Sequence, residues 1–261
     1  MRRLWLALLL LPPLASAARL PVPGVVGQDD RRIQASQRYP WTAIGRLNFT
    51  TGGFCTATVI GPRRVLTAAH CLWNRRTGRW YPPCALHFLA GYERSGYWVH
   101  ALAQAIHIAP GYRHGKGPRD RDWAVVVLDR DVSRQTGVIP VAPTGAGGAR
   151  TLIQAGYSRD RPHILTLNRA CRRLGQARSG RLLIHDCDAT FGDSGSPLLV
   201  RKGKHYRLVG MHVAFRRHAG KVQGIAVSSR AFADWLRRHP VKRPPGGAKA
   251  CALDPAADPP A

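Results

Sequence analysis

Short apolar runs recur along the chain from Trp41 onward, separated by glycine, proline and asparagine residues. Each run has the length of a β-strand, and most are rich in valine, isoleucine or leucine. Because no helical periodicity separates the runs, the pattern predicts an all-β protein, built as a sandwich or a barrel. The runs cover residues 56–60, 65–68, 124–128, 182–184, 198–200, 208–213 and 225–227.

The apolar pattern is interrupted once near the middle of the chain. Residues 131–150 contain the glycine- and proline-rich stretch PVAPTGAGGAR. Glycine and proline at this density indicate a loop rather than a strand. We therefore expect residues 131–150 to link two β-rich halves.

One helix is predicted near the end of the apolar pattern, in the stretch SSRAFADWLRRH. Ser228 or Ser229 is a suitable N-cap, and arginines occupy the last turn. Pro240 ends the helix, and the tail 241–261 is poor in apolar residues. The face predicted to be buried carries Phe232, Trp235 and Leu236.

The first 17 residues have the pattern of a secretory signal peptide, which predicts a secreted or periplasmic protein. Two arginines precede an apolar run over residues 4–11, and Ala15-Ser16-Ala17 fits the cleavage rule for small residues. This run is too short to span a bilayer, and prolines interrupt it. We expect cleavage after Ala17 and no transmembrane segment elsewhere.

The cysteine count is even, and the cysteines all follow the predicted signal peptide. Outside the cytosol, six cysteines are expected to form three disulfides, for which roughly fifteen connectivities exist. The sequence contains no C-x-x-C motif and no histidine pair at ligand spacing, so we expect neither a metal nor a cofactor. The cysteines are Cys55, Cys71, Cys84, Cys171, Cys187 and Cys251.

The formal net charge is +26, which favours association with anionic surfaces. The basic residues are spread along the whole chain, and no nucleic-acid-binding motif accompanies them. We expect a generally cationic surface with non-specific binding to anionic surfaces, and no dedicated nucleic-acid site.

Three separate stretches carry residues of a nucleophilic site, in the order His70, Asp122, Ser194. They read VLTAAHC, RDWAVVVL and FGDSGSP. A serine hydroxyl is a poor nucleophile at neutral pH and needs a hydrogen-bonded base, which histidine supplies. A buried carboxylate orients the imidazole, and main-chain N–H groups stabilise the oxyanion. Taken singly, His70 would be a structural histidine beside a cysteine, Asp122 a residue at a strand end, and Ser194 part of a surface turn. Together the three predict a Ser-His-Asp triad.

The blocks LTAAHC, DWAVVVL and GDSGSP resemble the signature blocks of the chymotrypsin-like serine proteases. The resemblance covers residues 25–240 and implies two antiparallel six-stranded β-barrels with a C-terminal helix, in a single trypsin-like protease domain. Barrel one would span about residues 25–130 and barrel two about 151–240. His70 would be the general base, Asp122 its orienting acid and Ser194 the nucleophile, with an oxyanion hole formed by Gly192 and Ser194.

Within that family, the sequence resembles the bacterial branch that includes the glutamyl endopeptidases. VVGQDDRRI and YPWTAIGRL are similar to the start of their mature chains. CDATFGDSGSP and GMHVAF are similar to their nucleophile and pocket segments. The resemblance implies a serine endopeptidase that acts through an acyl-enzyme on protein or peptide substrates, and we expect it to be a monomer.

The same resemblance suggests how the cysteines pair. Cys55 and Cys71 match the family disulfide that closes the loop carrying the catalytic histidine. Cys171 with Cys187 would brace the loop before the nucleophile. The pair Cys84 and Cys251 is then left over and would tie the tail to the first barrel.

The residue expected to select the P1 side chain is left open between two interpretations. Asp188 lies at the position where trypsin carries the aspartate that selects lysine and arginine. His212 matches the histidine that contacts an acidic P1 side chain in glutamyl endopeptidases, and Thr190 would add a hydroxyl. The basic net charge favours acidic substrates, so acidic P1 residues are slightly ahead.

The family resemblance also suggests how the enzyme is switched on. Val25-Val26-Gly27 resembles the family's mature N-terminus, which implies a short propeptide over residues 18–24. A new amino group at Val25 would pair with Asp193, although no basic cleavage residue precedes it. The alternative function is a catalytically weak, cationic binding protein on the same fold.

Overall fold

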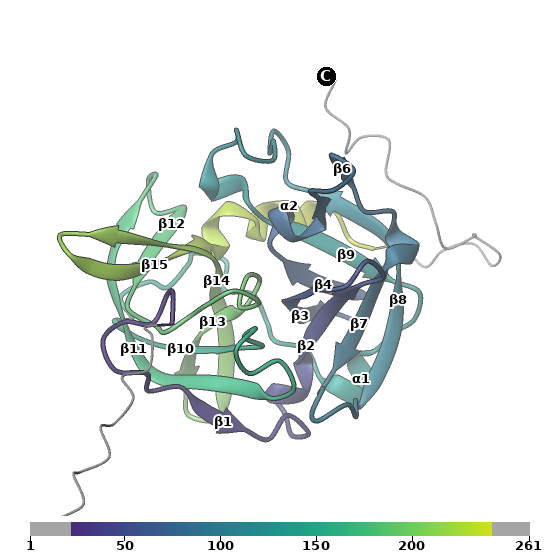
Figure 1. Ribbon diagram of the computed structural model, residues 1–261, viewed down its shortest axis with the longest axis horizontal. Coiled ribbons are helices and arrows are strands. Elements are labelled where there is room, and N and C mark those ends of the chain that lie inside the picture. The colour runs from purple at the N-terminus through teal and green to yellow at the C-terminus, as the bar shows by residue number, and fades with distance from the viewer. Residues whose placement is uncertain (1–21, 242–261) are drawn as a thin grey trace, which may run out of the picture.

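The computed structural model describes residues 22–241, and its strands form two barrels that lie side by side (Figure 1). The first barrel is closed and antiparallel. Around the barrel its strands are β2 (Ile44–Phe49), β3 (Phe54–Gly61), β4 (Arg64–Thr67), β9 (Ala124–Leu128), β8 (Val99–Ile108) and β7 (Leu86–Ala90).

The second barrel is formed from the later part of the chain. Its sheet closes because β12 pairs with β11 as well as with β15. In order, the strands are β11 (Leu165–Ala177), β10 (Thr151–Gly156), β13 (Pro197–Lys202), β14 (His205–His218), β15 (Lys221–Ser228) and β12 (Leu182–His185). The predicted architecture of two six-stranded antiparallel barrels is confirmed.

The start of the chain differs from the expected division into barrels. Strand β1 (Arg32–Gln34) pairs with β11, so it extends the sheet of the second barrel. We expected barrel one to begin near residue 25, but its first strand begins at Ile44. β1 is the edge strand of this sheet, and its pairing with β11 places the segment against the second barrel.

The buried side chains explain why these segments form strands. All five positions of β9 are buried, which fits its uninterrupted run of alanine, valine and leucine. In β7 buried and partly exposed positions alternate, as expected for a strand with one face on the core. Six of the seven apolar runs lie within a strand of the structure, and the run 65–68 extends one residue beyond β4, which ends at Thr67.

The connection between the barrels contains little regular structure. Its one α-helix among the described residues, α1 (Ser133–Thr136), is four residues long. Val141 then forms an isolated bridge with Leu208, which holds the connection against the second barrel.

The predicted C-terminal helix is present but shorter than expected. A 3-10 turn, η5 (Ser229–Ala231), precedes α2 (Ala233–Arg238). The Ser228 hydroxyl caps η5 by accepting a hydrogen bond from the Arg230 N–H. Phe232 and Leu236 are buried, as the predicted face requires. The other short elements are η1 (Trp41–Ala43), η2 (Ala69–Leu72), β5 (Trp73–Asn74), β6 (Arg79–Trp80), η3 (Pro83–Ala85) and η4 (Arg119–Arg121).

Two disulfides brace the barrels. Cys55 is bonded to Cys71, and Cys171 to Cys187, as the family resemblance implied. The expected pairing of Cys84 with Cys251 lies outside the described residues, as do the signal peptide 1–17 and most of the propeptide 18–24. Within residues 22–241, no helix is long and apolar enough to cross a membrane.

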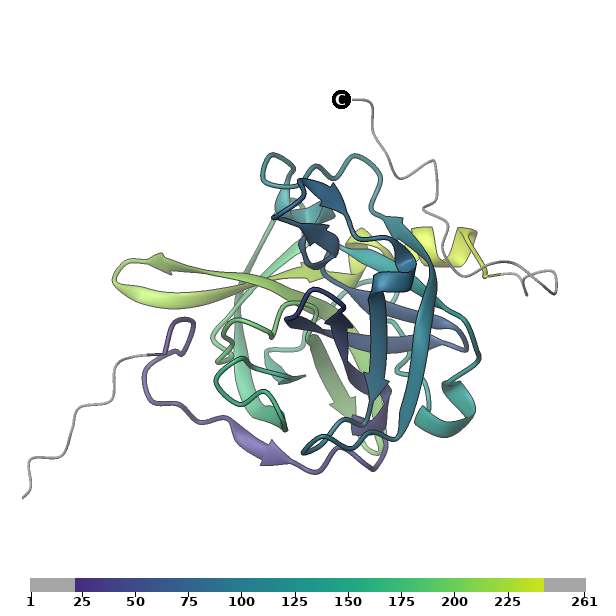
Figure 2. The same ribbon diagram turned by 45° about the vertical axis from the view of Figure 1, so that its right-hand side comes forward.

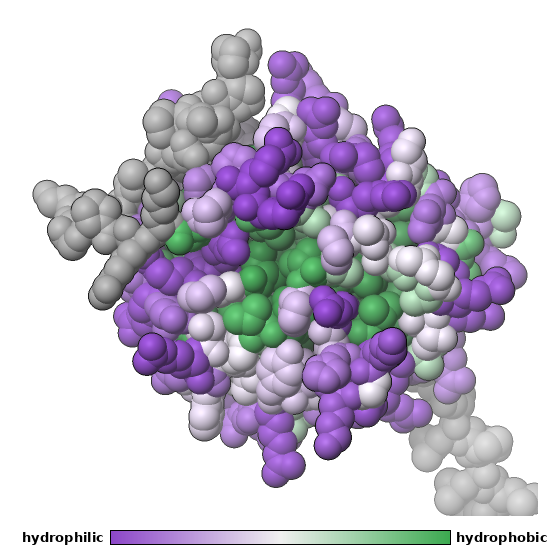
Figure 3. Space-filling model, turned by 180° about the vertical axis from the view of Figure 1, so that it is seen from behind, coloured by the Kyte–Doolittle hydropathy of each residue, from purple (hydrophilic) through white to green (hydrophobic). Residues whose placement is uncertain are grey.

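Hydrophilic side chains cover much of the face seen from behind (Figure 3). Seen from behind, hydrophobic residues gather in the middle of the face, and hydrophilic ones surround them (Figure 3). The β14–β15 hairpin projects from the second barrel with a basic tip, where His218 pairs with Lys221 (Figure 2).

Candidate active site

The three residues predicted to form a triad lie within hydrogen-bond distance of one another. His70 Nε2 lies 2.9 Å from Ser194 Oγ, and His70 Nδ1 lies 2.7 Å from Asp122 Oδ2. The main-chain N–H of His70 also donates to Asp122 Oδ1, at 2.9 Å. The imidazole is therefore bonded at both nitrogens, and the His70 side chain is 25% exposed against 10% for the Asp122 side chain.

Short 3-10 turns place the histidine and the aspartate. His70 belongs to η2, directly after β4, and the Cys55–Cys71 disulfide ties η2 to β3. Asp122 follows η4 and precedes β9, which is the strand hydrogen-bonded to β4. Because β4 and β9 are neighbours, their ends bring His70 and Asp122 together.

The turn that carries Ser194 requires the glycines on either side of it. Gly192 has φ of +94°, and a Cβ there would lie 2.7 Å from the Tyr157 carbonyl oxygen. Gly195 has φ of +89°, and its Cβ would lie 1.9 Å from the Thr56 carbonyl oxygen. Any other residue would combine left-handed backbone strain with a collision, so the turn conformation depends on both glycines.

The same turn leaves two main-chain donors available. Within residues 22–241, the N–H groups of Gly192 and Ser194 donate to no other residue. Thr56 fixes the turn from β3: its N–H donates to the Ser194 carbonyl at 2.9 Å, and its hydroxyl donates to the Gly192 carbonyl at 3.1 Å. The carbonyls are thereby held by the first barrel, and the N–H groups remain unpaired next to the serine hydroxyl.

Asp193, between these two donors, is fully buried, and burial raises the pKa of its carboxyl to about 6. Its Oδ2 accepts the Ser158 hydroxyl at 2.6 Å and the Thr190 N–H at 2.9 Å. Its Oδ1 accepts the Ser196 hydroxyl at 3.4 Å. In the uncleaved chain the Val25 nitrogen is a peptide amide that donates to the Val22 carbonyl at 3.2 Å, so the pairing of a new Val25 amino group with Asp193 stays a prediction.

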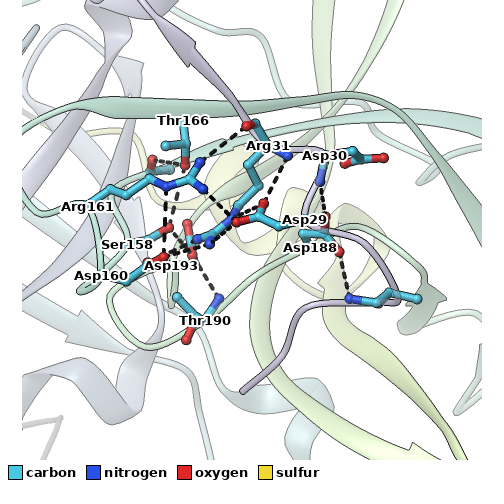
Figure 4. A network of polar contacts seen from close by, with 12 residues as sticks. Asp29, Asp30, Arg31, Ser158, Asp160, Arg161, Thr166, Asp188, Thr190 and Asp193 are labelled. Carbon is cyan, nitrogen blue, oxygen red and sulfur yellow. Dashed lines mark hydrogen bonds and ion pairs between the residues drawn. The ribbon is translucent and has the colours of Figure 1, made fainter. Parts of the chain in front are cut away.

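A charged network lies beside Asp193 (Figure 4). Arg31, whose side chain is 2% exposed, contacts Asp29 with Nε and Nη2 and Asp160 with both Nη atoms, at 2.7–3.1 Å. Arg161 donates to the same Asp29 at 2.6 Å. These ion pairs fasten the N-terminal segment to the loop after β10, which also carries Ser158.

Asp188 is engaged by the N-terminal segment. It is 3% exposed, and its two carboxylate oxygens accept the N–H groups of Val26 at 2.7 Å and Asp30 at 3.0 Å. Burial raises the pKa of this carboxyl to about 6. The structure therefore places Asp188 as the anchor of residues 26–30.

His212 is buried next to the nucleophile turn. Its main chain exchanges hydrogen bonds with Gly195 and Ser196, each at 2.8 Å. Its Nδ1 lies 3.2 Å from Nε2 of His185, which is also buried. Burial lowers the pKa of His212 well below the ordinary value and that of His185 to about 4, so both rings are neutral at pH 7.

The tautomers of both rings follow from one further hydrogen bond. The Cys187 N–H donates to His185 Nδ1 at 3.2 Å, so in neutral His185 the proton is on Nε2. His185 Nε2 then donates to His212 Nδ1, which leaves the proton of His212 on Nε2. Gly224 makes room for this pair, because a Cβ there would lie 2.1 Å from the His185 ring.

Sequence reasoning singled out the triad, Asp193 and His212, but it missed their partners. His185 and Ser158 lie in no recognised motif and are 27 and 35 positions from the residues they contact. Arg31 lies in the stretch VVGQDDRRI, but nothing in that stretch singles it out. The only signal was the polar His185 at the end of an apolar strand. Thr190, which was expected to contribute a hydroxyl to the pocket, is buried and donates its N–H to Asp193.

Comparison with known proteins gives similar chains of the same kind. A glutamyl endopeptidase of Bacillus licheniformis is 26% identical over 151 residues, which is 56% of this chain and 46% of the relative. Serine protease 23 of Mus musculus is 28% identical over 193 residues, covering 64% of this chain and 47% of the relative. The chain thus spans about half the length of both relatives.

The fold is also found among solved structures. A structure of a Glu endopeptidase in complex with MPD matches with a TM-score of 0.70 at 22% identity, covering 82% of this chain and 98% of that chain. The trypsin family profile matches residues 30–236. This match covers most of the chain, including the triad and both barrels, and so the chain belongs to the trypsin family.

Proposed function

We propose that this chain is a secreted serine endopeptidase that hydrolyses peptide bonds through an acyl-enzyme. The observation that carries the proposal is the imidazole of His70, bonded at Nε2 to Ser194 Oγ and at Nδ1 to Asp122. This geometry is what a nucleophile, a base and an orienting acid require.

In the acylation step, Ser194 Oγ attacks the scissile carbonyl carbon and transfers its proton to His70 Nε2. Asp122 accepts hydrogen bonds from the ring and the main chain of His70, so it holds the tautomer and stabilises the imidazolium. The N–H groups of Gly192 and Ser194 bind the oxyanion, an effect of roughly 3–4 kcal/mol per donor. His70 then returns its proton to the leaving amine.

Deacylation repeats these roles with water as the nucleophile. His70 takes a proton from the water molecule, the second tetrahedral intermediate collapses, and Ser194 Oγ recovers its proton. The small residues around the hydroxyl are Gly192, Gly195 and Ser196, and a Cβ at Gly192 would lie 2.8 Å from the Phe54 ring.

For the P1 residue, we propose an acidic side chain ahead of a basic one. His212 retains a proton on Nε2 for a carboxylate, and Thr190 is the second candidate contact. Asp188, the candidate for binding a basic side chain, has both oxygens occupied by Val26 and Asp30. The relative from Bacillus licheniformis is named a glutamyl endopeptidase, and a net charge of +26 attracts acidic substrates.

Secretion is proposed from residues 1–17 together with the two disulfides. Disulfides persist in oxidising compartments and are rare in the cytosol. The family resemblance and the pattern of residues 18–27 support removal of a short propeptide.

The test is a cleavage profile on a mixed peptide library. We expect the wild-type protein to cleave and Ser194→Ala to lose about 100,000-fold or more in kcat/KM, because the nucleophile is removed. Ser179→Gly is a matched control: Ser179 is an exposed serine with φ of +52°, where glycine is unstrained. Absence of cleavage by folded wild type would instead favour the alternative, a cationic binding protein on a protease fold.

The same library identifies the P1 preference. We expect glutamate and aspartate to be preferred over lysine and arginine, and Asp188→Asn to leave that preference unchanged. A preference for lysine or arginine that disappears in Asp188→Asn would overturn the assignment of His212 and restore Asp188 as the specificity residue.

A further inference from the structure

A polar pocket of about 270 Å³ lies beside α2, and the residues on either side of Asp122 line it. Four stretches that are distant in sequence line it: residues 109–110 after β8, the segment before β9, Arg181 directly before β12, and η5 with α2. Four arginines face it, and the last three of these stretches supply them. We call it the arginine pocket, and its basic residues are Arg121, Arg181, Arg230 and Arg238.

The negative charges near the arginine pocket do not neutralise it. Asp120 is buried and is paired with Arg181 at 2.7 Å. Asp234 lines the pocket, but its side chain is 76% exposed and pairs with Arg237, which lies outside the pocket. Four guanidinium groups thus face one buried, paired carboxylate and one solvated carboxylate.

Most donors in the arginine pocket have no acceptor. Arg121 uses one N–H on the Pro110 carbonyl and Arg238 one on the Asp234 carbonyl, of five that each guanidinium carries. The Arg230 guanidinium makes no hydrogen bond or ion pair with another residue in the range 22–241. It lies beside Gly180, where a Cβ would be 2.9 Å from its Nη1.

A buried indole adds a second, independent sign of a ligand. Trp123 also lines the pocket and is 2% exposed, and its Nε1–H has no acceptor in the described part of the chain. Buried donors in folded proteins are nearly always paired, so an unpaired one calls for an explanation. An anion bound among the arginines would supply the missing hydrogen-bond acceptor and a negative charge.

We propose that the arginine pocket binds a tetrahedral oxyanion, sulfate or phosphate, either free or as a monoester. Arginine forks match the paired oxygens of such groups, and several arginines with one N–H donor suit an acceptor that has four oxygens. A volume of 270 Å³ corresponds to roughly nine water molecules at ~30 Å³ each, which is enough for the anion and part of its hydration shell.

The arginine pocket adjoins the candidate triad along the chain. Arg121 and Trp123 are the residues on either side of Asp122, and the Trp123 N–H donates to the Arg121 carbonyl at 2.8 Å. The Asp122 N–H donates to the Arg119 carbonyl in the same turn. A bound anion would therefore rest on the segment that positions Asp122, although the site itself does not depend on the proteolytic function.

The test is calorimetric titration of the full chain with sodium sulfate, sodium phosphate and phenyl phosphate. Sodium chloride keeps the ionic strength constant, because a basic protein responds to salt in general. We expect saturable binding with one site per chain. Tighter binding of phenyl phosphate than of inorganic phosphate would assign the group to an organic ester, and the reverse would assign it to the free ion.

Variants separate a built site from general basicity. Arg230→Gln should weaken binding roughly 10- to 100-fold, since a charged hydrogen-bonding group is lost. Arg230→Lys keeps the positive charge but loses the paired N–H donors of the guanidinium. Trp123→Phe keeps most of the packing but loses the indole N–H. Both variants should weaken binding less than Arg230→Gln does. The control is Arg237→Gln, which removes an equal charge from the exposed side of α2.

Two results would overturn the proposal. One is equal affinity in Arg230→Gln and Arg237→Gln, which would mean that only net charge matters. The other is a heat signal that follows ionic strength and is the same for chloride as for sulfate. Thermal unfolding in chloride alone identifies any variant that fails to fold, and Arg230→Lys then carries the comparison.

Discussion

At the scale of single residues, burial acts against the ionised form of Asp193. The carboxyl is buried, and burial raises its pKa to about 6. The hydrogen bonds from the Ser158 hydroxyl and the Thr190 N–H act in the opposite direction, because they favour the ionised form. In the unfolded chain the same group ionises near pH 4. Between these values the folded protein holds a proton that the unfolded chain has lost.

This difference predicts how Asp193 affects stability. The stability that the protonated Asp193 carboxyl contributes to the fold is fully present below about pH 4 and is lost as the pH rises through about 6. The free energy of unfolding of wild type, minus that of Asp193→Asn, should fall by roughly 1–3 kcal/mol between pH 4 and pH 7. Urea unfolding of both proteins at pH 4, 5, 6 and 7 measures it.

The comparison between variants removes an opposing contribution. His185 and His212 have lowered pKa values, so the wild-type protein gains stability from them as the pH rises towards 6.5. That gain is common to wild type and Asp193→Asn and cancels in the difference. Asp234→Asn, at an exposed carboxylate, controls for the loss of one charge. A difference that does not change with pH would contradict the account of Asp193.

Single residues were predictable from the sequence where a motif names them. His70, Asp122 and Ser194 each lie in a recognisable block, and the structure brings their side chains together. Ser158 and His185 were not predictable as partners of Asp193 and His212, because both contacts join segments that only the closed barrel brings together. Asp188 shows the limit of position alone, since two main-chain N–H groups already occupy its carboxylate.

At the scale of elements, predictability follows burial. β9 is buried at all five positions, and its apolar run identifies it. β11 has thirteen residues, but its last ten, NRACRRLGQA, are largely exposed, so no apolar run marks it. β14 likewise continues past its apolar run into the exposed hairpin with β15. In these parts, main-chain pairing rather than side-chain burial extends the strand.

The strand β8 shows a second reason for missed elements. Its sequence VHALAQAIHI alternates between buried and partly exposed positions along its first half. A search for continuous apolar runs overlooks such a strand, whereas a period of two would have found it. The alternation breaks between Ala103 and Ala105, where the pairing with β9 shifts register.

At the scale of the whole molecule, Arg31 joins the start of the chain to the second barrel. Its side chain is almost completely buried and spans Asp29 and Asp160. We expect Arg31→Gln to destabilise the fold by about 3 kcal/mol, because it leaves partly buried carboxylates without their partner. Urea unfolding at pH 7 measures the loss.

A matched variant separates burial from charge in this network. Arg161→Gln removes an arginine that pairs with the same Asp29, but its side chain is 32% exposed. Exposed pairs contribute little, so we expect a loss of about 1 kcal/mol or less. Equal losses in the two variants would show that the burial of Arg31 is irrelevant.

The position of β1 has a consequence for how the protein is made. Arg32 pairs with Leu167, 135 positions further along the chain, so the ribosome delivers one strand long before its partner. Contacts of such long sequence separation form slowly and leave an edge unpaired meanwhile. The first barrel can assemble as soon as β9 has left the ribosome. Residues 22–34 have no partner strand at that stage, so they must not pair with the strands of the first barrel. The charges in this early segment, Asp29, Asp30, Arg31 and Arg32, suit a strand that has to remain solvated until the second barrel arrives.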